Sequence, residues 1–188
     1  MSVTKLNTAV PSFANSGKLR RLARLKAAEG AATETFHGDC TGMLRLLNEA
    51  LATELLCVLR YRRHHFVARG LESDRIAHEF LVHADEDLAH ADLLAARIVQ
   101  LGGEPDFSPE ALQRSRHSEY LEGRHIFDMV RENLASEQMA IESYRGLLEY
   151  IGERDPQTRR MLEGILSVKE AHADELLDFV PAEPDPAV

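Results

Sequence analysis

The chain has 188 residues, of which 28% are charged, and a formal net charge of -9 at pH 7. This length fits one domain with a sizeable core, and the acidic balance excludes a protein whose whole surface binds nucleic acid. No apolar run is long enough to cross a membrane or to act as a signal peptide. We therefore expect a cytoplasmic protein with no membrane partner.

Residues 1–38 are predicted to form a flexible basic arm. Its cations outnumber its acids, since Lys5, Lys18, Arg20, Arg21, Arg24 and Lys26 stand against Glu29 and Glu34. On an acidic body, such an arm can bind DNA, line a pore or pack along a neighbouring subunit. The sequence leaves these three roles open.

Four long amphipathic segments follow in residues 39–180, each with an apolar stripe that recurs at steps of three and four. The stripes run from Leu47 to His65, from Ile76 to Leu94, from Phe127 to Ile151 and from Leu162 to Phe179. This period predicts four long helices packed as a left-handed bundle.

The breaks between the four segments predict how the helices are connected. The turns ARGLES, with Ser73 as N-cap, and GERDPQT, with Asp155 as N-cap, are short and close two helical hairpins. The stretch from Gly102 to Ser118 can cross the length of the bundle, with a short helix opening at Ser108. Residues 181–188 form a Pro-rich tail that forbids a long fifth helix. The predicted fold is therefore all-α, a four-helix bundle of two hairpins joined by a long crossover.

Two phrases occur twice in the chain, in the same order. LATE at 51–54 returns as LASE at 134–137, and AHADLL at 89–94 returns as AHADELL at 171–177. Such a repeat indicates a duplicated helical hairpin. Glu54 and His90 lie at similar distances from their turn, so they should meet at one height, and Glu137 and His172 should do the same. Pseudo-two-fold symmetry then brings all four together in the middle of the bundle, with Asp87 beside them.

A polar cluster of this kind is difficult to explain as packing. A buried carboxylate costs several kcal/mol unless it is paired, hydrogen-bonded or bound to a metal. Carboxylates with two imidazoles suit iron or manganese better than a structural zinc, and helical bundles with this pattern hold paired metal ions. The sequence therefore predicts a metal site within the bundle.

The segments LNEALATELLCVLRYRRHHF and DLAHADLLAARIVQLGGEPDF resemble the first helix, and the second helix with its exit, of the bacterioferritins. The resemblance covers about residues 40–179 and implies an iron-oxidising subunit of the ferritin-like superfamily. It implies that Glu54 and Glu137 are terminal glutamate ligands, that His90 and His172 are the histidine ligands, and that Tyr61 lies near the site. Iron is then the expected metal, as one or two ions per subunit, with manganese or zinc as alternatives.

Two positions depart from the family pattern, in which a bridging glutamate precedes each histidine by three residues. Here Asp87 and Lys169 occupy those positions. Asp87 keeps a carboxylate, and neighbouring Glu86 could substitute for it after a small helix rotation. A protonated Lys169 cannot bind metal. With three site carboxylates it leaves a net charge of -2, which favours a single divalent ion; alternatively, Lys169 extends to solvent and its charge matters little.

Other residues near the site carry weaker signals. His83 could be an extra ligand, a proton relay or a core residue with a hydrogen-bond partner. Cys57, one turn after Glu54, is interpreted as a small core residue. Leu88 occupies the position where haem-binding bacterioferritins have a methionine, so no haem is expected.

The tail also predicts the assembly. The DNA-protecting starvation proteins (Dps) resemble this chain in lacking a fifth helix, and they form cages of twelve subunits. We expect a homo-oligomeric cage, with twelve subunits favoured over twenty-four, that oxidises Fe(II) with O2 or H2O2 and stores the product. The alternative is a structural or DNA-binding cage whose metal site is degenerate, with Lys169 forming an internal salt bridge.

Overall fold

The computed structural model describes Arg21, Arg24 and residues 40–68, 73–115 and 122–180. Its long helices are α2 (Cys40–Val67), α3 (Ser73–Gln100), α5 (Ile126–Ile151) and α6 (Pro156–Leu177), and α4 (Pro109–Ser115) is short. The described residues contain no β-strand. The predicted basic arm, except for Arg21 and Arg24, and the Pro-rich tail lie outside the described residues, so the absence of a fifth helix stays a prediction.

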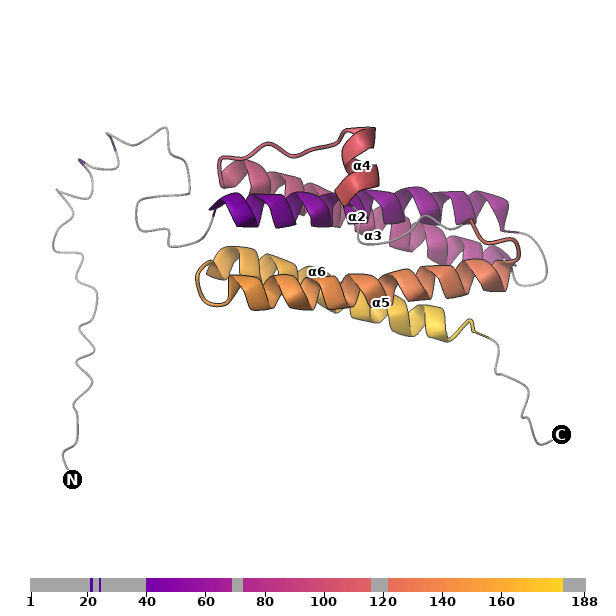
Figure 1. Cartoon of the computed structure of the whole chain (residues 1–188). Coiled ribbons are helices and arrows are strands. Elements are labelled where there is room, and N and C mark those ends of the chain that lie inside the picture. Colours follow the sequence, from indigo (N-terminus) through magenta and orange to yellow (C-terminus); the bar gives the residue numbers. More distant parts are fainter. Residues whose placement is uncertain (1–20, 22–23, 25–39, 69–72, 116–121, 181–188) are drawn as a thin grey trace, which may run out of the picture.

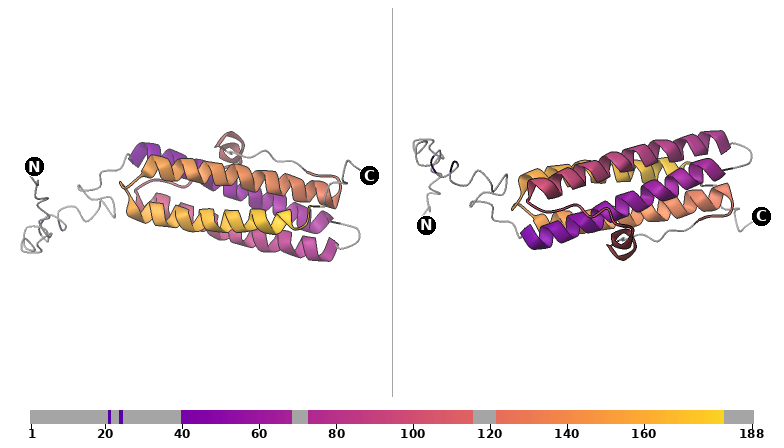
Figure 2. Two further views of the ribbon diagram at one scale, coloured as in Figure 1. Left: turned by 90° about the horizontal axis from the view of Figure 1, so that it is seen from below. Right: turned by 90° about the horizontal axis from the view of Figure 1, so that it is seen from above.

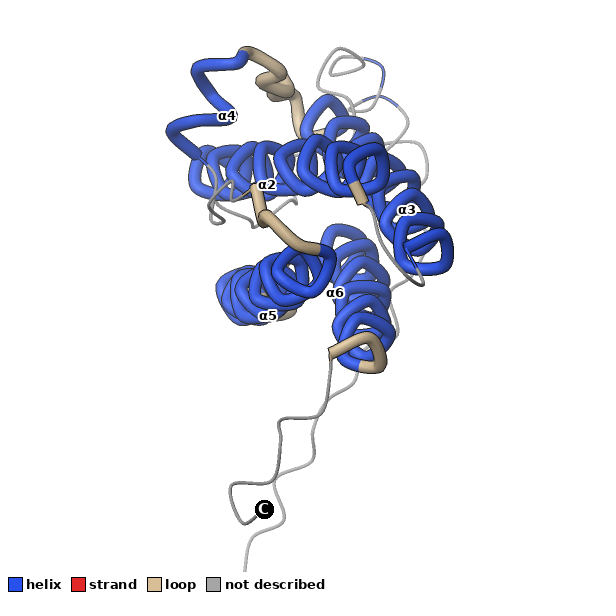
Figure 3. The backbone as a smooth tube through the Cα atoms, turned by 90° about the vertical axis from the view of Figure 1, so that its right-hand side faces the viewer, coloured by secondary structure: helices blue, strands red, loops and turns tan. Residues whose placement is uncertain are grey.

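The four long helices form two antiparallel hairpins, α2 with α3 and α5 with α6, that lie side by side (Figures 1 and 2). Viewed along the bundle, the two pairs occupy separate halves of the cross-section (Figure 3). Helix α3 ends and α5 begins at opposite ends of the bundle, so the connection between them runs its length, as the sequence predicted. None of the described helices is long and apolar enough to cross a membrane.

Local sequence signals explain where these helices begin and end. Asp155 caps α6 by accepting hydrogen bonds from the backbone N–H groups of Gln157 and Thr158, and Pro156 occupies the first turn. The predicted short helix α4 follows Ser108, whose hydroxyl accepts a hydrogen bond from the backbone N–H of Ala111. Gly102 follows α3 with a φ of 80°, a left-handed conformation common directly after a helix.

The apolar core is divided into two clusters along the bundle. One contains Leu51, Ala91, Ala140 and Ile165, and the other contains Cys57, Ala84, Val130 and Leu176. On every long helix, the residues between these two clusters are those of the predicted polar site. The fold therefore places the site in the middle of the bundle, with apolar packing at both ends of it.

Candidate metal centre

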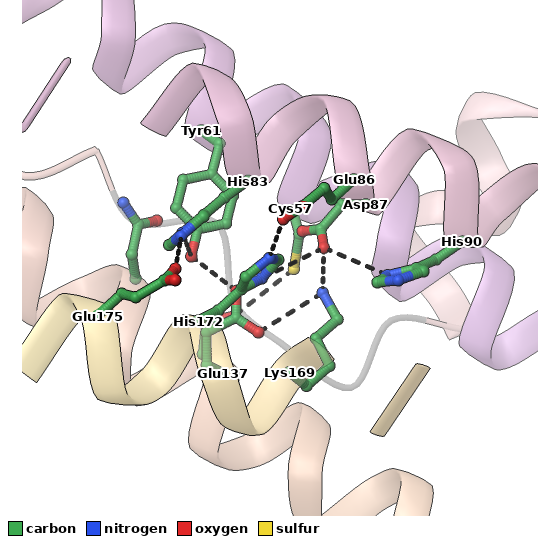
Figure 4. Close-up of polar contacts among 12 residues, drawn as sticks. Cys57, Tyr61, His83, Glu86, Asp87, His90, Glu137, Lys169, His172 and Glu175 are labelled. Carbon is green, nitrogen blue, oxygen red and sulfur yellow. Dashed lines mark hydrogen bonds and ion pairs between the residues drawn. The ribbon is translucent and has the colours of Figure 1, made fainter. Parts of the chain in front are cut away.

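The structure brings the predicted site residues together from all four long helices. They are buried, with exposed fractions between 0% and 7%, and most are labelled in Figure 4: Glu54 from α2, Asp87 and His90 from α3, Glu137 from α5, and Lys169 and His172 from α6. The repeats therefore predicted correctly that these side chains lie together at one height in the bundle.

The acidic and imidazole groups form two half-sites that share Asp87. One half-site consists of Glu54, Asp87 and His90, and the other of Asp87, Glu137 and His172. Within each half-site, one ligand atom from every residue lies within 4.8 Å of the ligand atoms of the other two. The distance from His90 Nδ1 to Glu54 Oε2 is 3.4 Å, and that from His172 Nδ1 to Glu137 Oε1 is 3.7 Å. Each histidine therefore faces the glutamate of its own hairpin, as predicted.

Each site glutamate accepts a hydrogen bond from a tyrosine of the other hairpin. Tyr61 on α2 donates a hydrogen bond of 2.6 Å to Glu137 Oε1, and Tyr144 on α5 donates one of 2.7 Å to Glu54 Oε1. Burial and the adjacent glutamates raise the pKa of both phenols well above their ordinary value, so both remain donors. Sequence reasoning singled out Tyr61 but missed Tyr144. The signal was present, since each tyrosine follows a site glutamate by seven residues.

The Lys169 side chain is fully buried in the middle of the cluster. Its Nζ contacts an oxygen of Asp87 and lies 3.0 Å from Glu54 Oε2 and 3.5 Å from Glu137 Oε2. Burial alone would lower the pKa of this ammonium, but Asp87, Glu137 and Glu54 outweigh it and raise the pKa well above its ordinary value. The alternative that Lys169 extends to solvent is therefore wrong.

The lysine also affects the pKa values of the carboxyl groups around it. Burial would raise the pKa of Glu54 and of Glu137, but Lys169 and the neighbouring histidines outweigh burial, and the pKa of each is lowered. At Asp87, burial and the two glutamates prevail over Lys169, and the pKa is raised. For His90, burial opposes protonation, but Asp87 and Glu54 raise its pKa to about 9.

Five buried atoms of the site make no hydrogen bond, although ion pairs reach four of them, all but Asp87 Oδ2. They are Glu54 Oε2, Asp87 Oδ2, His90 Nδ1, Glu137 Oε2 and His172 Nδ1. Buried polar atoms without a hydrogen bond are rare, and here each is an oxygen or imidazole nitrogen that can ligate a metal. The residues present therefore fit a carboxylate- and imidazole-bound cation, with the charge of Lys169 as the one opposing feature.

Glu86 has a different role from the substitute ligand suggested by the sequence. Asp87 itself lies in the cluster, whereas Glu86 is half-exposed and accepts a hydrogen bond of 2.6 Å from His172 Nε2. That contact fixes the imidazole with Nδ1 toward the cluster, which is how carboxylates orient metal-binding histidines in proteins. Glu170, the next carboxylate along α6, is exposed and pairs with Arg145.

A further buried polar group lies beside the site and was not predicted. Arg60 Nε donates to Asn133 Oδ1 at 2.9 Å, and Asn133 Nδ2 donates to His64 Nδ1 at 3.0 Å. Its charged and imidazole side chains make RYRRHH, at residues 60–65, a mostly solvated face by prediction, but Arg60 and His64 are buried. Cys57, 3.4 Å from Arg60, is a core residue as predicted, and burial raises its thiol pKa to about 11.

The chain matches the ferritin-like domain over residues 44–181, and it therefore belongs to that family. It is 33% identical over 141 residues to the nutrient stress-induced DNA-binding protein of a Synechococcus strain, covering 71% of this chain and 78% of the relative. It is 27% identical over 131 residues to the bacterioferritin of Desulfovibrio desulfuricans, covering 69% of each chain.

Solved structures of the family are similar to this one along most of their length. The dodecameric thioferritin of Bacteroides fragilis, a bacterioferritin-related protein, has a TM-score of 0.72 at 25% identity, covering 85% of this chain and 91% of its own. Dps from Thermosynechococcus elongatus also has a TM-score of 0.72, at 22% identity, covering 79% and 95%. The second similarity concerns the fold alone. The resemblance predicted from the sequence, to bacterioferritin and Dps subunits, is confirmed.

Proposed function

We propose that this protein is a subunit of an iron-storing cage, and that it takes up Fe(II) as substrate in the centre of the bundle and oxidises it there. The observation that carries the proposal is the set of five buried ligand atoms without hydrogen bonds, which converge from four helices. Glu54, Asp87, His90, Glu137 and His172 supply these atoms. Oxygen ligands with two imidazole nitrogens match Fe(II) and Mn(II).

The charge of the site supports one divalent ion per subunit rather than two. Three carboxylates and the Lys169 ammonium leave a net charge of -2, because the carboxylates hold the lysine in its charged form. One divalent ion neutralises this charge, whereas two would leave +2 in a buried site, which is costly. The Lys169 ammonium also lies between the two half-sites, against their shared ligand Asp87.

Each bound Fe(II) gives up one electron, so two ferrous ions are oxidised in turn for every oxidant molecule consumed. Their two electrons, with two protons from water, convert O2 to H2O2, or convert H2O2 to two molecules of water. Tyr61 and Tyr144 would hold the two glutamates in position while iron enters and leaves, because each hydrogen bond reaches across from the opposite hairpin.

A twelve-subunit cage is the assembly we propose. The dodecameric thioferritin is similar to this chain over most of both lengths, at 25% identity, which supports that assembly. DNA binding through the basic arm is a separate proposal. It is supported by the composition of residues 1–38 and by the DNA-binding name of the 33% identical relative.

A second candidate function is favoured by one specific observation, the ion pairing of Lys169 with all three carboxylates. In this alternative the Lys169 ammonium permanently occupies the position of the metal ion. The subunit then helps to build the cage but oxidises no iron. The two candidates differ in metal content and in the rate of iron oxidation.

The experiment that separates them is aerobic addition of Fe(II) to the metal-free protein, following ferric absorbance and oxygen uptake, beside the Lys169→Glu variant. Rapid, saturable oxidation by the parent, with one ion bound in the central cluster of each chain, is expected. Lys169→Glu should bind a second ion and oxidise iron faster, because it restores the missing carboxylate. Glu170→Gln, an exposed neighbour on α6, is the matched control and should behave like the parent. Parent oxidation no faster than buffer would favour the inactive-centre alternative.

A further inference from the structure

We propose that Glu79, His83 and Glu175 form a second divalent-cation site, between α3 and α6 and separate from the central cluster. One ligand atom from each of the three residues lies within 4.8 Å of the other two. His83 Nε2 is 2.9 Å from Glu175 Oε2 and 3.6 Å from Glu79 Oε1. The side chains of His83 and Glu175 point toward each other in Figure 4.

Both ring nitrogens of His83 have a hydrogen-bond partner in this structure. Tyr61 has one hydroxyl hydrogen, and it is donated to the Glu137 carboxylate at 2.6 Å. The same hydroxyl lies 3.3 Å from His83 Nδ1 and must accept there, so His83 Nδ1 is the donor. His83 Nε2 in turn donates to Glu175 Oε2 at 2.9 Å, because a carboxylate can only accept, so a proton now lies where a cation would bind.

A divalent cation bound here would displace the Nε2 proton and contact the imidazole and both carboxylates. The donor set of one imidazole and two carboxylates suits Fe(II), Mn(II), Co(II) or Zn(II). The imidazole is fully buried, while the side chains of Glu79 and Glu175 are 26% and 52% exposed. A cation can therefore reach the site from solvent and keep water as its remaining ligands.

The His83 ring is also fixed in place, as a metal ligand should be. It stacks on His172, with ring centroids 3.9 Å apart and planes 16° from parallel. His172 in turn donates its Nε2 hydrogen to Glu86. The proposed site thus lies one imidazole away from the central cluster, on the side where three partly exposed carboxylates line α3 and α6. It does not depend on whether the central cluster binds metal.

The test uses Co(II) as the probe, added to full-length, metal-free protein and followed by calorimetry and by visible absorbance. The central cluster is first disabled with Glu54→Gln and Glu137→Gln together, which leaves Lys169 paired with Asp87 at net charge zero. This background should still bind one Co(II) per chain. Adding Glu79→Gln and Glu175→Gln should weaken that binding by at least about 10-fold, since two ligands are altered.

Glu170→Gln in the same background is the matched control and should leave Co(II) binding unchanged, because Glu170 is exposed and pairs with Arg145 of α5 rather than with the proposed site. Anomalous diffraction from a Co(II)-soaked crystal should place the ion against His83 Nε2. No Co(II) bound in the background, or binding that does not respond to the Glu79 and Glu175 changes, would overturn the proposal: the glutamates would then only accept a proton from His83. If the parent protein bound Co(II) at Glu79, His83 and Glu175 but not in the central cluster, that result would count against the proposed iron site. The second cation site would still be supported.

Discussion

Replacing Lys169 with methionine tests whether the ammonium acts as the internal counter-ion of the cluster. Methionine keeps most of the side-chain volume but leaves three buried carboxylates without the ammonium that contacts all of them. Breaking a buried ion pair by removing one partner costs about 3–5 kcal/mol. Whole proteins are stable by only about 5–15 kcal/mol, so the metal-free variant should be severely destabilised.

Thermal unfolding of the metal-free protein at a fixed subunit concentration is the assay. For a chain of this size each kcal/mol moves Tm by about 2–4 °C, so the variant should melt about 6–20 °C below the parent. Saturating Mn(II) should restore much of the loss, because an ion at 100 times its Kd stabilises the folded state by about 2.7 kcal/mol. The same Mn(II) should raise the Tm of the parent less.

A double variant provides the control for this prediction. Adding Glu137→Gln to Lys169→Met removes one of the three carboxylates that have lost the ammonium. The double variant should therefore lose less free energy of unfolding than the two single variants lose in sum. If Lys169→Met melted within about 2 °C of the parent and did not respond to Mn(II), the reasoning would be refuted. The lysine would then contribute no net charge stabilisation to the centre.

Three further predictions follow from the same contacts. Tyr61→Phe and Tyr144→Phe should each lower the free energy of unfolding by about 1.5–3 kcal/mol, and by similar amounts, because each removes one bond to a buried carboxylate; urea unfolding measures both, and a large difference would contradict the pseudo-two-fold role. The His90 pKa of about 9 lies above its unfolded value of about 6.5, so the stabilisation is full below pH 6.5 and is lost as pH rises through 9. It amounts to about 3 kcal/mol, and His90→Gln should flatten this pH dependence in urea unfolding of the metal-free protein. Deleting residues 1–30 should abolish any salt-sensitive DNA gel shift while the cage remains intact by light scattering; a shift retained by the deleted protein would place DNA binding elsewhere.

The positions of the site residues along the helices could be predicted from the sequence, because a helical hairpin fixes which residues lie at one height. Glu54 and His90 were placed opposite each other by counting from their turn, and the structure has them 3.4 Å apart. The same counting would have identified Tyr144 from Tyr61, had the repeat been followed one heptad further.

What the sequence could not give is the direction of long side chains. A lysine on a helix seam can reach solvent or fold inward, and only the three carboxylates around its Nζ determine which state is lower in free energy. Arg60 is a similar case. Its charge predicts exposure, but Asn133 on α5 lies where it can accept a hydrogen bond from the buried guanidinium. Such contacts depend on packing between hairpins, which no local pattern encodes.

The pseudo-two-fold axis explains why this one lysine matters more than its neighbours. Asp87 and Lys169 occupy equivalent positions, each three residues before a site histidine, and they meet across the axis as a direct ion pair. With carboxylates at both positions, the centre would carry four negative charges, which two divalent ions neutralise. With a lysine at one of them, the charge is -2, and the ammonium itself lies between the half-sites. The duplicated hairpin is therefore symmetric in its glutamates, histidines and tyrosines but not in charge, and we propose that this asymmetry limits the centre to one divalent ion.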